Sequence, residues 1–170
     1  MKAIQIDGER LSWSDCEVGE PGPREVRIAV RASAVNRADL LQRRGAYPPP
    51  SGASEILGLE CSGIVDSLGT GVTSCARGDE VCALLAGGGY AEQVVVPSAQ
   101  VLPVPPGVSL VQAAALPEVF ATAYLNLFLE AGLVPGERAL LHAGASGVGT
   151  AGIQLCAAFG SPCYVTAGSD

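Results

Sequence analysis

The sequence has little charge, a single histidine and no closely spaced pair of cysteines. Charged residues make up 16% of the 170 residues and apolar residues 48%, which excludes a disordered chain and is enough for a packed core. The six cysteines are scattered without a C-x-x-C pair, so neither a zinc knuckle nor a disulfide framework is indicated. We expect free thiols in a reducing compartment.

Long apolar runs and positive charge are also scarce. No apolar run approaches the ~18 residues of a membrane span, and the first residues, MKAIQID, lack the apolar core of a secretory signal. The formal net charge of −7 repels nucleic acid and anionic membrane surfaces. We therefore expect a soluble, cytoplasmic protein with no nucleic-acid partner and no membrane partner.

Short runs with a period of two fill the chain from its start to about Pro106, separated by Gly, Pro, Ser and Asp. In the clearest run, Val26, Ile28 and Val30 alternate with other residues, as in a strand that has one buried face. Further strands are expected at 2–6, 61–68, 80–85 and 91–96. This pattern predicts a compact, mostly β barrel or sandwich.

After Pro106 the pattern becomes helical. Ser109 is a candidate helix cap, Pro117 a candidate first residue of a helix, and Gly132 a candidate terminator. The elements expected are a helix ending at 115, a helix at 118–129, a strand at 139–142, a helix at 147–159 and a strand at 163–166. The last three form one β-α-β unit of a parallel nucleotide-binding sheet. Because one crossover covers only one face of such a sheet, we expect a truncated or split version of a longer protein.

The loop GASGVG at 144–149 lies between the expected strand and helix. This placement lets backbone N–H groups and the helix amino terminus hold a pyrophosphate. Ser146 stands where the usual G-x-G-x-x-G pattern has its middle glycine, so its hydroxyl borders the phosphates and can donate to one of them. The alternative is a glycine-rich turn that serves only the tight packing of strand and helix.

The end of the next strand bears on the choice of cofactor. NAD-binding folds place an acidic residue about 20 positions beyond the loop, where it holds the ribose 2′-hydroxyl. Gly168 and Ser169 occupy that place, and these small residues leave room for a 2′-phosphate. We therefore expect NADPH in preference to NADH. A shift of one or two residues would instead bring the carboxylate of Asp170 to the ribose.

Six segments resemble, in order and spacing, the zinc-independent quinone oxidoreductase (zeta-crystallin-like) branch of the medium-chain dehydrogenase/reductase superfamily. They are AVNRAD at 34–39, GLECSG at 58–63, GDEV at 78–81, GGYAE at 88–92, ATAY at 121–124 and HAGASGVG at 142–149. The resemblance implies a mixed α/β chain: a GroES-like, mostly β domain at 1–117 and the incomplete start of an NADPH-binding Rossmann domain at 118–170. It also implies a homodimer when the protein is full length.

In zinc-bearing alcohol dehydrogenases of this superfamily, the matching positions supply two cysteines and a histidine to a catalytic metal. This chain has Asn36, Leu59 and Glu118 there, so the resemblance implies an enzyme without a metal. Its acceptor must then be electrophilic already. The implied activity is that of an NADPH:quinone oxidoreductase, which reduces quinones by hydride or electron transfer.

Two alternatives stay open. An enoyl or enone reductase of the same superfamily would have the same cofactor geometry. A catalytically inactive fragment or interaction module, pairing with a partner through an exposed sheet edge, is the alternative from another class.

The resemblance places Asn36, Tyr47 and Thr122 beside the nicotinamide as catalytic residues. The expected cofactor-binding residues are Tyr47, Thr122, Gly144, Ser146, Gly147, Val148, Gly149, Gly168 and Ser169. Some of these side chains also have simpler interpretations. Tyr47 could pack on the prolines that follow it and Asn36 could form a turn. Likewise, Asp39 could cap a helix, while His142 and Glu60 could be structural.

Overall fold

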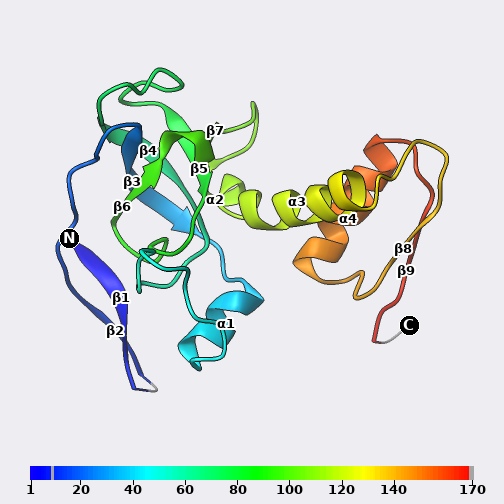
Figure 1. The fold of residues 1–170 in the computed structure, drawn as a ribbon, viewed down its shortest axis with the longest axis horizontal. Helices are drawn as coiled ribbons and strands as arrows, with labels where there is room; N and C mark the ends of the chain where they lie inside the picture. The colour runs from blue at the N-terminus through cyan, green and yellow to red at the C-terminus, as the bar shows by residue number, and fades with distance from the viewer. Residues whose placement is uncertain (9, 169–170) are drawn as a thin grey trace. The chain divides into compact units, whose positions relative to one another are not determined.

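The structure, a computed structural model, describes residues 1–8 and 10–168. The chain forms two compact units, Met1–Pro117 and Glu118–Asp170. The first is mostly β and the second contains a single β-α-β unit (Figure 1). The expected mixed α/β class is therefore confirmed. No helix within the described ranges is long and apolar enough to cross a membrane.

A five-stranded antiparallel sheet forms the centre of the first unit. Its strand order is β6-β3-β4-β5-β7. The strands are β3 (Glu25–Ser33), β4 (Glu60–Leu68), β5 (Glu80–Leu84), β6 (Gln93–Pro97) and β7 (Val101–Pro103). The period-two pattern places Val26 and Ile28 on the buried face of β3, where they join a core drawn from β4, β5 and β6. Two register shifts between β3 and β4 bend this pair, as bulges do.

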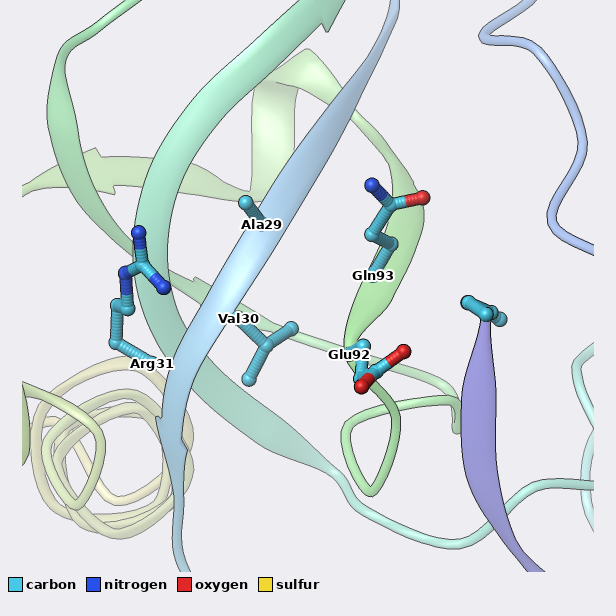
Figure 2. Close-up of a pocket in the computed structure, with 6 residues that line it drawn as sticks. Ala29, Val30, Arg31, Glu92 and Gln93 are labelled. Atoms are coloured by element: carbon cyan, nitrogen blue, oxygen red, sulfur yellow. The ribbon is translucent and has the colours of Figure 1, made fainter. Parts of the chain in front are cut away.

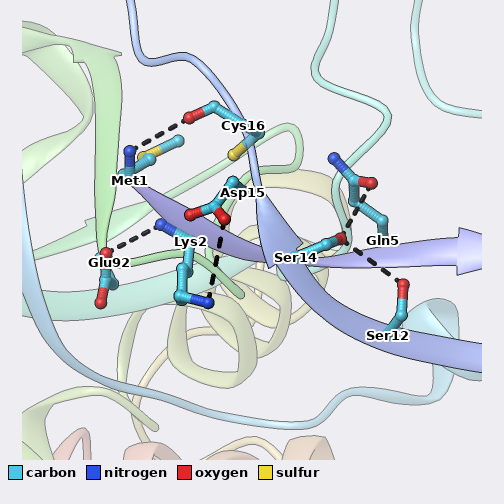
Figure 3. Close-up of polar contacts among 8 residues, drawn as sticks. All are labelled: Met1, Lys2, Gln5, Ser12, Ser14, Asp15, Cys16 and Glu92. Carbon is cyan, nitrogen blue, oxygen red and sulfur yellow. Dashed lines mark hydrogen bonds and ion pairs between the residues drawn. The ribbon is translucent and has the colours of Figure 1, made fainter.

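A separate antiparallel hairpin begins the chain: β1 (Lys2–Asp7) paired with β2 (Arg10–Asp15). Figure 3 shows how its start is fixed. The Met1 amino group donates to the Cys16 carbonyl at 3.1 Å, and the Lys2 backbone N–H donates to a Glu92 carboxylate oxygen at 2.8 Å. A bridge between Ala3 and Ala91 adds a further backbone link to the segment before β6. Strand β1 thus joins the hairpin to the rest of the first unit.

Three short helical segments complete this unit. They are α1 (Arg37–Arg43), the 3-10 turn Ser98–Gln100 and α2 (Leu110–Ala113). Ser109 caps α2, as expected, and accepts a hydrogen bond from the Gln112 N–H. The hydroxyl of Ser62 on β4 donates to the Leu110 carbonyl, which joins α2 to the sheet.

The second unit holds α3 (Pro117–Tyr124), a π-helix (Leu125–Glu130), β8 (Ala139–Leu141), α4 (Gly147–Ala158) and β9 (Cys163–Val165). Strands β8 and β9 are parallel, as expected for a β-α-β unit. The expected helical run at 118–129 is present, but from Leu125 it is a π-helix instead of an α-helix. There the Asn126 side chain donates to the Thr122 carbonyl at 2.8 Å, and the Ala131 N–H reaches back five residues to the Asn126 carbonyl.

Candidate cofactor-binding and active sites

The glycine-rich loop joins the end of β8 to the start of α4. Ser146 is the helix cap, and its Oγ accepts a hydrogen bond from the Gly149 N–H at 3.0 Å. This bond uses a lone pair and leaves the hydroxyl proton free to donate. The N–H groups of Gly147 and Val148, in the first turn of α4, have no acceptor within the helix. Together with the positive end of the helix dipole, these donors fit an anionic pyrophosphate.

Close packing explains most of the glycines in this loop. A Cβ on Gly149 would lie 2.4 Å from the Ala143 carbonyl oxygen, and a Cβ on Gly144 would lie 2.6 Å from the Val165 side chain. Ala143 itself adopts a left-handed backbone with φ 56°. The packing interpretation is thus compatible with phosphate binding, because the same close approach brings the amino terminus of α4 to the end of β8.

The carboxyl ends of β8 and β9 lie side by side. His142 Nδ1 and Thr166 Oγ1 are 3.1 Å apart and share a hydrogen bond that links the two strand ends. Gly168, from the expected ribose position, is exposed. The other two residues of that prediction, Ser169 and Asp170, lie outside the described residues. Beside the loop, a cavity of about 260 Å³ is lined by Asn126, His142, Ser146 and seven neighbours from the second unit.

In the first unit, a buried polar network surrounds Asn36, the cap of α1. The side-chain Nδ2 of Asn36 donates to Glu60 Oε1 at 2.7 Å, and its backbone N–H donates to Asp39 Oδ2 at 2.7 Å. Asp39 also accepts from the Tyr90 hydroxyl at 2.9 Å and from the Gly58 N–H at 3.1 Å. Glu60 is 1% exposed and Asp39 2%. Two buried carboxylates therefore hold one asparagine.

Burial raises the pKa values of two groups beside this network. Burial raises the pKa of Tyr90, and its hydrogen bond to Asp39 raises it further. Burial also raises the pKa of Cys61 to about 12, with smaller contributions from Cys82 and Glu60. Both side chains are consequently neutral at physiological pH, and the Tyr90 hydroxyl donates to Asp39.

The other predicted positions are placed as follows. Leu59 is 8% exposed and offers no ligand atom, whereas Tyr47 is 45% exposed in the bend that follows α1. Thr122 lies on α3 with its carbonyl accepting from Asn126, and Glu118 lies in the first turn of the same helix. In the described part of the chain, no three His, Cys, Asp or Glu side chains gather closely enough to hold a metal ion.

The structure brings the predicted residues together in two groups, one in each unit. Asn36 joins Glu60 and Asp39, and Ser146 joins Gly147, Val148 and Gly149. Sequence reasoning missed the contact of Glu60 with Asn36 and the part played by Tyr90. The available signal was a carboxylate at the start of the apolar strand β4, since a buried charge needs a partner.

A larger cavity, of about 570 Å³, lies beside the amino terminus (Figure 2). Its lining includes Met1 and the oppositely charged Arg31 and Glu92, which project from β3 and from the segment before β6. None of the predicted catalytic or cofactor-binding residues lines it. The two groups described above therefore stay the candidate sites.

The chain is similar to proteins that share this combination of elements. Residues 22–106 match the alcohol dehydrogenase GroES-like domain. The chain is 42% identical over 146 residues to the pikromycin polyketide synthase component PikAII of Streptomyces venezuelae. The aligned region covers 86% of this chain but 4% of that protein.

Solved structures show the same likeness. The CurK enoyl reductase has a TM-score of 0.88 at 31% identity, covering 98% of this chain and 54% of that one. The Pseudomonas syringae pv. tomato DC3000 quinone oxidoreductase has a TM-score of 0.84 at 35% identity, covering 99% of this chain and 53% of that one. The chain thus spans about half the length of these structures. It belongs to the alcohol dehydrogenase GroES-like family, within the medium-chain dehydrogenase/reductase superfamily of oxidoreductases.

Proposed function

We propose that the protein reduces a carbon–carbon double bond conjugated to a carbonyl, an enoyl thioester or enone, with NADPH and without a metal. The observation that carries the proposal is the donor set at the start of α4: the Ser146 hydroxyl and the N–H groups of Gly147 and Val148. The likenesses to the CurK enoyl reductase and to PikAII support the enoyl substrate class.

The division of roles follows from the residues. When bound, NADPH would supply the hydride, and a proton from solvent would complete the reduction of the double bond. Gly147 and Val148 donate N–H groups to the pyrophosphate, and the Ser146 hydroxyl adds a third donor. The second N–H of the Asn36 amide, which Glu60 does not use, donates to the acceptor oxygen as negative charge develops on it. Tyr47 and Thr122 add hydroxyl groups that position the nicotinamide ring.

Independence from metal follows from the side chains at the three matching positions. The amide nitrogen of Asn36 already donates to Glu60, and the buried Leu59 has no ligand atom. Zinc prefers thiolate and imidazole, neither of which is present at Asn36, Leu59 or Glu118. The acceptor oxygen is consequently stabilised by hydrogen-bond donors.

Quinone reduction is the second candidate, because the likeness to the quinone oxidoreductase supports it and a quinone needs the same hydride and the same donor. NADPH oxidation by the native protein, followed at saturating cofactor with a crotonyl thioester and with p-benzoquinone, separates the two. We expect the thioester to have the higher kcat/KM. A higher value for the quinone would favour the second candidate, and binding of NADPH without turnover of either acceptor would indicate a catalytically inactive module.

The cofactor preference has its own measurement. Residues 168 and 169 are Gly and Ser, with no acidic side chain to repel a 2′-phosphate, so we expect kcat/KM to be higher with NADPH than with NADH. One charge-assisted contact to that phosphate would contribute on the order of 1.5–3 kcal/mol, or roughly a tenfold to hundredfold preference. A ratio below one would mean that the carboxylate of Asp170 holds the ribose.

A further inference from the structure

Glu60 is a buried carboxylate that the proposed reaction does not use directly. It begins β4 and is 1% exposed, and its Oε1 accepts from Asn36 Nδ2 at 2.7 Å. An ionised carboxylate has only acceptor atoms, whereas an asparagine amide has a donor side and an acceptor side. The partner of Glu60 therefore has to present its NH2 group.

The backbone of Asn36 is fixed independently of its side chain. Its N–H donates to Asp39 Oδ2 at 2.7 Å, and Asp39 is held in turn by the Tyr90 hydroxyl and the Gly58 N–H. With the backbone fixed, the remaining freedom of Asn36 is the rotation of its side chain and the 180° flip of its amide. The bond to Glu60 restricts the NH2 end of the amide, and the capping box of α1 places the side chain beside the Asp39 N–H.

We propose that Glu60 is a positioning residue that fixes the amide orientation of Asn36, so that one N–H is committed to Glu60 Oε1 and the other is available to the acceptor. This inference rests on the proposed function for its catalytic consequence, but the orientation itself is a property of the protein without substrate. Ionisation of Glu60 is part of this proposal, because a neutral amide at this position would accept either orientation of its partner.

Glu60→Gln is the decisive variant. It keeps the size of the side chain but removes the charge and replaces one acceptor oxygen by an NH2 donor, so the amide of Asn36 should populate both orientations. We expect kcat to fall roughly tenfold, in line with the loss of one charge-assisted hydrogen bond. The KM for NADPH should not change, because the pyrophosphate donors lie in the second unit. Glu25→Gln is the matched control, since Glu25 accepts from the Gly22 N–H at 2.9 Å and belongs to neither site.

A direct readout comes from nuclear magnetic resonance. Residues 1–170 contain two asparagines, Asn36 and Asn126, so selective ¹⁵N labelling of asparagine side chains gives a small set of NH2 signals, in which Asn36→Ser identifies that of Asn36. Asn126, which donates to the Thr122 carbonyl, is the internal reference. In Glu60→Gln, the NH2 signals of Asn36 should shift, because one of its protons loses a charged acceptor, while the Asn126 signals stay unchanged.

The outcomes separate the two proposals. An unchanged Asn36 signal in a folded Glu60→Gln variant would overturn the positioning role, whatever the activity. Absence of turnover in the wild type would overturn the proposed function. The NH2 signal of Asn36 would then still test whether Glu60 fixes the orientation of the amide. As a second test, Glu60→Gln should have no further effect on kcat in an Asn36→Ala background, and additive effects would contradict an action through Asn36.

Discussion

At the scale of single residues, Ser146 combines two tasks that substitution can separate. Its Oγ caps α4 by accepting from the Gly149 N–H, and we propose that its hydroxyl donates to the pyrophosphate. Ser146→Asp should keep the cap, because aspartate is an equally good cap and favours the helix amino terminus. It should nevertheless weaken NADPH binding on the order of tenfold or more, since it adds negative charge beside a phosphate. Fluorescence titration of NADPH measures the dissociation constant.

Two further variants complete this comparison. Ser146→Val should weaken NADPH binding and also lose the cap, which contributes about 1 kcal/mol. Ser109→Ala is the control, because it removes the cap of α2 while leaving the loop intact. Equal dissociation constants for NADPH in all four proteins would show that Ser146 does not border the phosphates.

Gly149 is the loop residue for which a side chain is least tolerable. The Cβ of an alanine there would meet the Ala143 carbonyl oxygen at 2.4 Å, and backbone atoms have little room to give way. We expect Gly149→Ala to lower the free energy of unfolding of the second unit by about 1–3 kcal/mol, as overpacking does. Gly19→Ala, where nothing lies within 4 Å of the added Cβ, should be close to neutral. Urea unfolding curves of the two variants provide the comparison.

At the scale of elements, the sheet of the first unit should lose stability in alkaline solution. The pKa of Cys61 is raised to about 12 from a value of 9.0, and the pKa values of Cys82 and Tyr90 are also raised, chiefly by burial. A raised pKa means that the folded state holds its proton more tightly than the unfolded state. The free energy of unfolding should therefore be highest below pH 9 and fall as pH rises from 9 towards 12.

Each such group contributes a slope of up to about 1.4 kcal/mol per pH unit. Cys61→Ala should make the decline between pH 9 and 11 shallower, whereas Cys16→Ala, which removes a partly exposed thiol, should not. Urea titrations at a series of pH values test this expectation. A decline that is just as steep in Cys61→Ala would show that other groups dominate.

The elements also show how far sequence reasoning reaches. The period-two pattern of residues 25–34 predicted β3 because one face of that strand is buried. Strand β2 was missed, since its side chains are largely exposed and carry no burial pattern, and β7 was missed because only three residues pair, ending at Pro103. The π-helix was unpredictable for another reason: it depends on a side chain, Asn126, that competes for a backbone carbonyl.

The two candidate sites also differ in how far each could be predicted from the sequence. The loop at 144–149 is contiguous, so its place between a strand and a helix could be predicted directly. The contact of Asn36 with Glu60 joins residues 24 positions apart, across a helix cap and the first residue of a strand, and depends on the folded sheet. The sequence shows that Asn36 and Glu60 are present, but it does not show that their side chains pair.

At the scale of the whole molecule, activity should survive the removal of metal ions. The positions that match the zinc ligands of related enzymes hold an amide, an aliphatic side chain and a carboxylate, at Asn36, Leu59 and Glu118. After dialysis against a strong chelator, the rate of NADPH oxidation should match that of the untreated native protein. Stoichiometric zinc in the purified protein, together with loss of turnover on chelation, would contradict this assignment.

The strand order β6-β3-β4-β5-β7 has a consequence during synthesis on the ribosome. Strands β3, β4 and β5 are neighbours both in the chain and in the sheet, so this meander can pair as soon as Leu84 has emerged. Strand β6 then closes one edge, where Pro97 meets Glu25, and β7 closes the other. Such distant pairing is the slow step of a β fold, because a long loop must be closed first. The nascent chain can thus complete this sheet, including the Asn36–Glu60 contact, before the loop at 144–149 has emerged from the ribosome.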